Sequence, residues 1–345
     1  MSSQLVPART KPRTDDHPLW NIIFSFWATP AMLVAHDLKL FTLLGERPRT
    51  LSEVCASLGT PERSTEVLLH TNMTFGLIAQ HKRKYRLTAV AAEYLDERSP
   101  INLGGYLDFL VANHGLWSVA SLKKAVVTNS PQVGGGKDIF TDPEMQKAFA
   151  RGFTKAMYAH SIGSALVWPA SVELSKHRKL LDVGGGSGAQ TVGALLRWRK
   201  LTGIVLDTPP VIAEASQYIE PYELGDRIVL HSADMFTDPF PAADVHLYGD
   251  ILHDWPKDKG ALLVRKSFAS LPSGGMIILR EVLSNDSGSG PLPAAAYNVN
   301  MLLATTGGQY SKREMTSLLR EAGFRGVEIR SATAGYRSLI TARKR

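Results

Sequence analysis

A histidine and a glutamate stand at positions from which they could move a proton. His253 lies in the run Gly249-Asp-Ile-Leu-His-Asp-Trp255, which follows a predicted strand, and Glu281 ends the next predicted strand. Ligand sites in open α/β sheets lie outside the carboxyl ends of the strands. A histidine with a pKa of about 6.5 can accept a proton at neutral pH. A carboxylate beside it would hold the Nδ1 proton and stabilise the imidazolium. The pair therefore predicts general-base chemistry, although either residue alone could be structural.

A glycine-rich segment, Asp182-Val-Gly-Gly-Gly-Ser-Gly188, follows another predicted strand and opens a predicted helix. Its glycines would let the backbone approach a ligand and would expose N–H groups at a helix N-terminus. Asp207 ends the next strand and could accept both hydroxyls of a ribose. Asp234 and Met235 follow the third strand and suit an adenine, with a carboxylate for the amine and a thioether for the ring. The Gly-x-Gly-x-Gly spacing leaves little room for a pyrophosphate, so the set favours S-adenosylmethionine (SAM) over a dinucleotide.

The elements that must position these residues alternate between strands and helices from residue 179 onward. This alternation predicts a doubly wound, mostly parallel, Rossmann-like α/β sheet. The last two strands are separated by a short connection and should form an antiparallel hairpin at the edge of the sheet. The predicted strands are residues 180–183, 203–206, 228–231, 245–248, 276–280, 326–330 and 338–342.

The N-terminal third predicts a smaller helical domain. Residues 19–44 have helical spacing and are apolar on more than one face, so they must be buried in their own domain or against a partner chain. Thr50 and Glu53 form a potential capping box. The helix that they begin, a second helix from Pro61 and a hairpin near residues 81–84 make a winged helix-turn-helix. The second helix carries two acids and one arginine, which disfavours DNA binding and favours a role in dimer contacts.

Composition sets the limits on the protein's class. Hydrophobic residues make up 44% of the 345 residues and charged residues 21%, which is an ordinary globular balance. No run of 18 apolar residues and no secretory signal occurs, so neither a membrane partner nor export is expected. The net charge of +7 is scattered in short clusters, and we expect no nucleic-acid partner. The single Cys55 excludes an internal disulfide and fits a cytoplasmic location.

No metal site is predicted. His231, His246 and His253 fall on different strands or strand ends, and no His-x-x-x-His pair occurs. The predicted organisation is a disordered tail (1–18), a winged-helix dimerisation domain (19–100), connecting helices that contribute to the substrate pocket (101–170) and a SAM-binding catalytic domain (171–345).

Taken together, the motifs identify a family. The sequence resembles the class-I SAM-dependent small-molecule O-methyltransferases, which include caffeate, acetylserotonin and antibiotic-tailoring enzymes. The resemblance spans nearly the whole chain and implies methylation of a hydroxyl on an aromatic or polyketide-type small molecule. It also implies a homodimer formed through the N-terminal helical domain, and S-adenosylhomocysteine (SAH) as a product. The motifs that carry it are 182–188, Asp207, Asp234-Met235, His253-Asp-Trp255, Glu281, Gly307-Gly308 and Ala322-Gly-Phe324.

The resemblance assigns roles to individual residues. His253 takes the place of the general base and Glu281 that of the residue that orients it. The helix before the first strand and the region near Gly307 would supply contacts to cofactor and substrate. The expected cofactor contacts are Ser161, Asp182, Gly184, Gly186, Gly188, Asp207, Asp234 and Met235, and the expected substrate contacts are Phe153, Met157, His160 and Met301.

Two positions depart from the plant members of the family. Tyr310 replaces a second glutamate beside the base, and a phenol carries no charge at pH 7, so an imidazolium would be less stabilised. We still include Tyr310 among the expected catalytic residues. Gly249 replaces a lysine and opens space near the adenosine. These departures leave open C- or N-methylation, or a SAM-binding enzyme of decarboxylating, hydroxylating or pericyclic chemistry. A metabolite-sensing regulator and a nicotinamide dehydrogenase remain as weaker alternatives.

Overall fold

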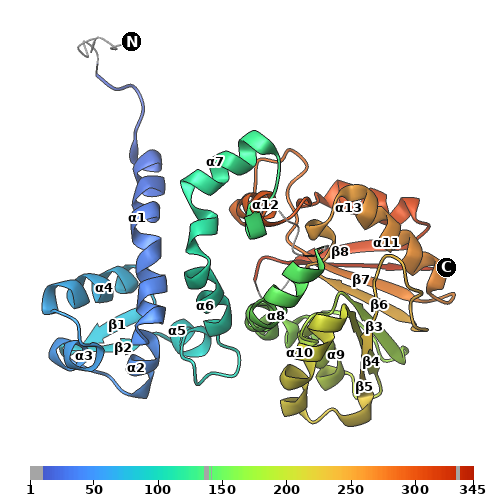
Figure 1. Cartoon of the computed structure of the whole chain (residues 1–345), viewed down its shortest axis with the longest axis horizontal. Helices are drawn as coiled ribbons and strands as arrows, with labels where there is room; N and C mark the ends of the chain where they lie inside the picture. Colours follow the sequence, from blue (N-terminus) through green and yellow to red (C-terminus); the bar gives the residue numbers. More distant parts are fainter. Residues whose placement is uncertain (1–10, 136–139, 141, 332–334) are drawn as a thin grey trace. The chain divides into compact units, whose positions relative to one another are not determined.

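The computed structural model describes residues 11–135, 140, 142–331 and 335–345. The chain divides into two compact units, with the division between Pro100 and Ile101 (Figure 1).

The first unit is built around a helix pair and a hairpin. Helix α3 begins at the capping box that Thr50 and Glu53 form, and Gly59 ends it in a left-handed conformation. An antiparallel β-hairpin follows α4, so the predicted winged helix is confirmed. The elements of this unit are α1 (His17–Asp37), α2 (Leu40–Glu46), α3 (Leu51–Leu58), α4 (Glu62–Thr74), β1 (Ile78–His81), β2 (Lys84–Leu87) and α5 (Ala89–Tyr94).

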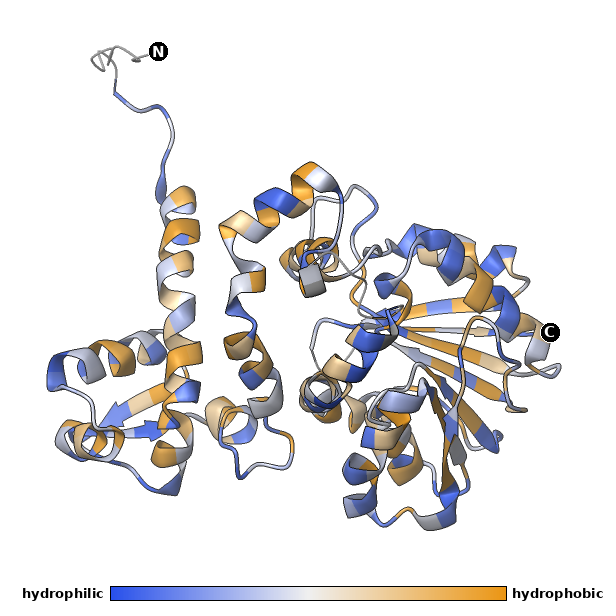
Figure 2. Ribbon diagram, in the orientation of Figure 1, coloured by the Kyte–Doolittle hydropathy of each residue, from blue (hydrophilic) through white to orange (hydrophobic). Residues whose placement is uncertain are grey.

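The apolar stretch expected over 19–44 is two helices rather than one. Lys39 adopts a positive φ of 61° between α1 and α2, which breaks the helical hydrogen-bond ladder. Helix α1 begins at His17, inside the segment expected to be a tail. Its large apolar residues are exposed, with Ile22 70% and Phe26 68% accessible, and hydrophobic residues occur along its length (Figure 2). Among the described residues, α1 alone is long and apolar enough to cross a membrane by length and composition, which the search for unbroken apolar runs did not anticipate.

The second unit contains the central sheet, whose strands lie in the order β5-β4-β3-β6-β7-β9-β8. The strands from β3 to β7 pair in parallel, and β9 pairs antiparallel with both β7 and β8. The predicted fold class and edge hairpin are therefore confirmed. The strand order reverses at β3, whose neighbours are β4 and β6, and this reversal is where such sheets bind ligands. The strands are β3 (Lys179–Val183), β4 (Thr202–Asp207), β5 (Ile228–Ser232), β6 (Val245–Gly249), β7 (Met276–Glu281), β8 (Arg325–Ser331) and β9 (Ser338–Arg343).

Helices cover both faces of this sheet (Figure 1). One hydrophobic core lies under α9 (Ala189–Arg197) and α10 (Pro209–Ile219), and the other lies under α11 (Lys257–Ser270) and α13 (Lys312–Glu321). The central strands β3, β6 and β7 are buried on both sides over nearly their whole length, as central parallel strands require. The remaining helices are α6 (Gly104–Ala112), α7 (Val119–Thr128), α8 (Pro143–Ala165) and α12 (Leu292–Ala304).

A glycine sets how α8 and α9 meet. A Cβ placed on Gly193 would lie 2.0 Å from the carbonyl oxygen of Ala165, so α9 approaches the end of α8 at backbone distance. Because α8 carries several expected ligand contacts and α9 begins at the glycine-rich turn, this close approach holds the two sides of the site together.

Candidate active site

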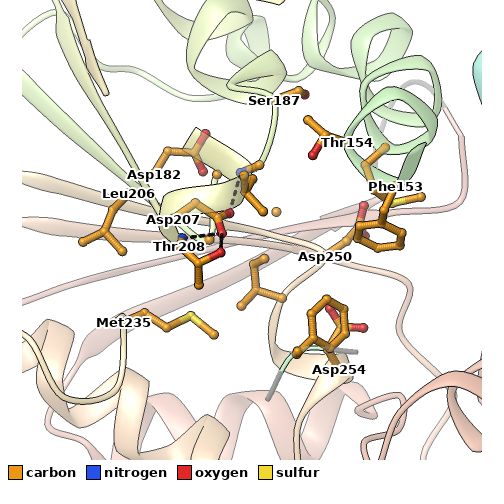
Figure 3. Close-up of a pocket in the computed structure, with 18 of the residues that line it drawn as sticks. Phe153, Thr154, Asp182, Ser187, Leu206, Asp207, Thr208, Met235, Asp250 and Asp254 are labelled. Carbon is orange, nitrogen blue, oxygen red and sulfur yellow. Dashed lines mark hydrogen bonds between the residues drawn. The ribbon is translucent and has the colours of Figure 1, made fainter. Parts of the chain in front are cut away.

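A cavity of about 400 Å³ lies at the carboxyl edge of β3, β4 and β6. Figure 3 shows Asp182, Asp207 and Met235 on one side of it and Phe153 and Asp250 on the other. Its volume is in the range of sites for small organic ligands. The second side is aromatic as well as polar, since Phe140, Phe149, Phe153, Phe236 and Trp255 contribute to the lining.

The glycine-rich turn forms the floor on the cofactor side. Gly184, Gly186 and Gly188 have φ values of 68°, 56° and 77°, which L-residues with side chains rarely adopt. A Cβ on Gly184 would meet Ile251 at 2.8 Å, whereas the space beside Gly186 is open. The N–H of Gly186 donates to Asp207 Oδ2 at 2.9 Å, so the turn and the end of β4 hold each other in place.

Two buried carboxylates face the same cavity. Burial raises the pKa of Asp182 to about 7, against the hydrogen bond that Thr191 donates to its Oδ2 at 2.8 Å. Burial also raises the pKa of Asp207. Asp182 Oδ1 is buried and has no hydrogen-bond partner among the described residues. The unpartnered Asp182 oxygen and the Asp207 carboxylate call for a ligand with hydrogen-bond donors, and the ammonium and ribose hydroxyls of SAM meet that requirement.

The adenine-side residues also line the cavity. Asp234 follows β5, and its Oδ1 accepts a hydrogen bond from the N–H of Phe236 at 2.7 Å, which fixes the carboxylate. Met235 directs its thioether toward the cavity (Figure 3). The residues present therefore fit the bound cofactor from its amino-acid end to its base.

His253 and Glu281 form a buried dyad beside this cavity. His253 Nδ1 lies 2.6 Å from Glu281 Oε2, and the two residues are 4% and 1% exposed. The other oxygen of Glu281 accepts the N–H of Leu252 at 2.9 Å, so the carboxylate is fixed on both sides. Burial lowers the pKa of His253, but the charge and hydrogen bond of Glu281, together with the charges of Asp254 and Asp250, outweigh burial and raise the pKa above its ordinary value. The arrangement assigns the Nδ1 proton to the bond with Glu281 and leaves Nε2 to exchange a proton with a substrate.

Asp250 brings a third potential metal ligand to the dyad. One ligand atom from each of Asp250, His253 and Glu281 lies within 4.8 Å of the others, a grouping that the search among histidines did not consider. Both oxygens of Glu281 already accept hydrogen bonds. The contacts between His253 and Glu281 are therefore those of an acid–base pair.

A buried polar network that the sequence did not reveal adjoins the dyad. Arg337 Nε lies 2.5 Å from Asp250 Oδ2, and its Nη2 lies 2.9 Å from His160 Nε2. His160 Nε2 is also 2.8 Å from the hydroxyl of Tyr297. Burial and the charge of Arg337 lower the pKa of His160 to about 3, so this imidazole is neutral. Asp250 could have been predicted as a site residue, because it follows a strand of the sheet. No local pattern in the sequence marks Arg337.

The expected site residues divide into two groups. Ser161, Phe153, Met157 and His160 on α8 line the cavity together with Asp182, Gly184, Gly186, Asp207, Asp234 and Met235. Five expected residues do not line it within the described part of the chain, although Ile251 and Asp254 on either side of His253 do: Gly188, His253, Glu281, Met301 and Tyr310.

Met301 and Tyr310 lie apart from the cavity for identifiable reasons. Met301 is 4% exposed, and Thr305 donates to its sulfur at 3.7 Å. The hydroxyl of Tyr310 faces α11, where a Cβ on Gly260 would lie 2.4 Å from it. Tyr310 is part of the core under α11 and α13. It therefore does not lie beside the cavity, where it was expected in place of a second glutamate.

Known sequences match the chain over nearly its whole length. The family model of the O-methyltransferase domain matches residues 120–325, and that of the O-methyltransferase dimerisation domain matches residues 20–97. The 3-hydroxy-5-methyl-1-naphthoate 3-O-methyltransferase of Streptomyces sahachiroi is 33% identical over 327 residues, covering 93% of each chain. The tetracenomycin polyketide synthesis 8-O-methyl transferase of Streptomyces glaucescens is 30% identical over 336 residues, covering 94% of this chain and 95% of the relative.

A solved structure agrees with these matches. Human N-acetylserotonin methyltransferase in complex with SAM superimposes with a TM-score of 0.83 at 26% identity, covering 97% of this chain and 99% of the other. The donors and acceptors of the cavity agree with these matches because they fit SAM. The chain belongs to the family of SAM-dependent O-methyltransferases that carry a dimerisation domain.

Proposed function

We propose that this enzyme methylates a hydroxyl group on an aromatic or polyketide-type small molecule, with His253 as the general base. The observation that carries the assignment is the 2.6 Å contact between His253 Nδ1 and Glu281 Oε2, beside the cavity at the switch point of the sheet. SAM supplies an electrophilic methyl group, so transfer forms a C–O bond as the C–S bond breaks and yields SAH.

The protein's own contribution is positional and electrostatic. His253 takes the hydroxyl proton at Nε2, and Glu281 stabilises the resulting imidazolium through Nδ1. The aromatic lining excludes water and holds the acceptor in line with the methyl group. Because the pKa of His253 is raised to about 10, with Glu281 the largest of the contributions that raise it, the imidazole is protonated at neutral pH. The neutral form that takes the hydroxyl proton therefore predominates only in alkaline solution, so the rate should rise with pH.

The substrate class rests on the cavity and on the relatives. The acceptor side is lined by Phe140, Phe153 and Trp255, which suit a flat ring. The two curated relatives are named for a naphthoate and for tetracenomycin polyketide synthesis. An acceptor of one or more fused aromatic rings is consistent with both observations.

The enzyme is proposed to work as a homodimer in the cytoplasm. Helix α1 lies in the segment that matches the dimerisation domain, and its exposed Leu19, Ile22, Phe26 and Trp27 offer the apolar face that a second copy would cover. Dimer formation explains the exposed apolar residues of α1 without a membrane. The scattered positive charge argues against a nucleic-acid partner. Light scattering of the wild type and of Phe26→Glu tests it: we expect a dimer that the substitution dissociates.

Incubation with isotopically labelled SAM and a panel of naphthols, phenols and polyketide aromatics tests the activity. We expect a product heavier by one methyl group, formed in step with SAH, with the label on oxygen. His253→Ala should lower turnover by about 10² to 10⁴ while SAH still binds. His231→Ala is the control, since His231 lies in β5 and is not part of the His253–Glu281 dyad. An unchanged rate in His253→Ala would refute the base.

A further inference from the structure

Asp250 occupies a strained position where the cofactor side of the cavity meets its aromatic side. It follows β6 with a positive φ of 58°, and its N–H donates to the carbonyl of Arg280 at 2.9 Å. Aspartate tolerates this conformation better than most residues with side chains do. Residues held in this way cluster where the chain must aim a side chain at a ligand.

The two oxygens of Asp250 have different surroundings. Oδ2 accepts from Arg337 Nε at 2.5 Å. Oδ1 is buried and has no hydrogen-bond partner among the residues that the structure describes. The side chain nevertheless lines the cavity (Figure 3). A buried carboxylate oxygen without a donor is costly, and a ligand that supplies the donor removes that cost.

Asp250 can act only as an acceptor of hydrogen bonds. Burial raises its pKa, but the charges of Arg337, His253 and Arg280 outweigh burial and bring the pKa below its ordinary value. The carboxyl group is therefore ionised at neutral pH. An ionised carboxylate rejects other acceptors, such as ether oxygens, and favours hydroxyl or amine groups.

The distance to the dyad specifies where that donor should be. One carboxylate oxygen of Asp250 and one ring nitrogen of His253 lie within 4.8 Å of each other. Two hydrogen bonds of about 2.8 Å, made by hydroxyls on adjacent ring carbons, span such a separation.

We propose that Asp250 is a specificity-determining residue that accepts a hydrogen bond, at Oδ1, from a second hydroxyl adjacent to the hydroxyl that is methylated. The preferred acceptor is then a vicinal aromatic diol rather than an isolated phenol. This inference rests on the proposed function, because it assumes an aromatic acceptor beside His253.

Binding of three matched naphthols to the enzyme–SAH complex tests the inference. The probes are 2,3-dihydroxynaphthalene, 3-methoxy-2-naphthol and 2-naphthol, titrated by calorimetry. Because a hydrogen bond to a charged acceptor is involved, we expect wild type to bind the diol about 10- to 100-fold more tightly than either other probe. Asp250→Asn retains the size of the side chain but can present its NH₂ to the ligand, so the preference for the diol over the methoxy compound should vanish or reverse.

Thr154→Val is the matched control. Thr154 also lines the cavity, and its buried hydroxyl has no partner within the described chain, so removal of that hydroxyl should leave the preference for the diol within about twofold. Loss of the preference in Thr154→Val instead of Asp250→Asn would overturn the assignment.

Three further outcomes would contradict the proposal in distinguishable ways. Equal affinity of wild type for all three probes, or binding of none at their solubility limit, overturns the role of Asp250 even if Asp250→Asn fails to fold. Weaker SAH binding by Asp250→Asn, with the diol preference intact, would assign Oδ1 to the cofactor's ammonium group. Failure of wild type to bind SAH at all would refute the proposed function itself.

Discussion

Replacing Glu281 by Gln should change how the rate depends on pH as well as the rate itself. The substitution keeps the size of the side chain and an oxygen that can accept the Nδ1 proton of His253, but it removes the negative charge. The partner atoms lie 2.6 Å apart, which places the centres of charge about 4 Å apart. At an effective dielectric constant of about 20, this pair is worth about 4 kcal/mol.

That energy corresponds to a change of about three in the pKa of His253, since one pKa unit is about 1.4 kcal/mol. The charge of Glu281 raises the pKa of His253 in the wild type, and burial alone would lower it. In Glu281→Gln the pKa should therefore fall from about 10 to about 7, close to its ordinary value, because Asp254 and Asp250 still raise it. The rising limb of the pH–rate profile should move toward acid by about two to three pH units, because the base becomes neutral at lower pH.

The maximum rate should fall at the same time. Without the carboxylate, the imidazolium formed during the reaction loses its stabilising partner, and we expect a loss within the 10² to 10⁴ range of general-base catalysis. Carbon-13 NMR of the histidine Cε1 in the SAH complex gives the pKa without any acceptor, with the signal assigned through His253→Asn. Glu321→Gln, on the exposed side of α13, is the control. An unchanged pKa of His253 in Glu281→Gln would refute this electrostatic account.

Three further predictions concern the cofactor and stability. Asp207→Ala should weaken SAH binding by about 10- to 100-fold in calorimetry, since a charged acceptor is lost. Gly193→Ala should lower the free energy of unfolding in urea by about 1–3 kcal/mol or more, because its Cβ would meet the Ala165 carbonyl. Gly152→Ala, at an exposed position of α8, is the control and should be neutral or stabilising. Burial lowers the pKa of His246 to about 3, so as pH falls from about 6.5 the unfolded state binds the proton first and stability drops by about 1.4 kcal/mol per pH unit. His246→Asn should lower the slope of urea midpoints measured between pH 7 and pH 5 by that amount, leaving the similar contribution of His160.

Strands were predictable because their patterns are local. Residues 276–280 are apolar apart from one arginine and emerge as β7, buried throughout. Because β6 and β7 are parallel neighbours, the residues that follow them meet at one edge, and this placed His253 beside Glu281. The glycine-rich turn was recognisable for the same reason, since strand, turn and helix are continuous in the sequence.

The features that escaped prediction depend on distant parts of the chain. Arg337 reaches Asp250 only because β9 pairs with β7, and no nearby residue signals that contact. The orientation of Tyr310 is decided by the small Gly260 on α11, which leaves room for its hydroxyl. The break at Lys39 interrupts a stretch whose apolar spacing continues on both sides, so spacing alone predicted one helix.

The position of β9 also determines the order in which the enzyme can assemble during synthesis. Both of its neighbours, β7 and β8, leave the ribosome first, and β9 must then insert between them. Until residue 343 has been synthesised, one edge of the buried β7 has unpaired backbone groups and invites other strands. Arg337 arrives with the same segment, so Asp250 lacks its ion-pair partner Arg337 before that moment. A nascent chain arrested shortly before β9 would hold most of its sheet yet remain inactive and prone to aggregate.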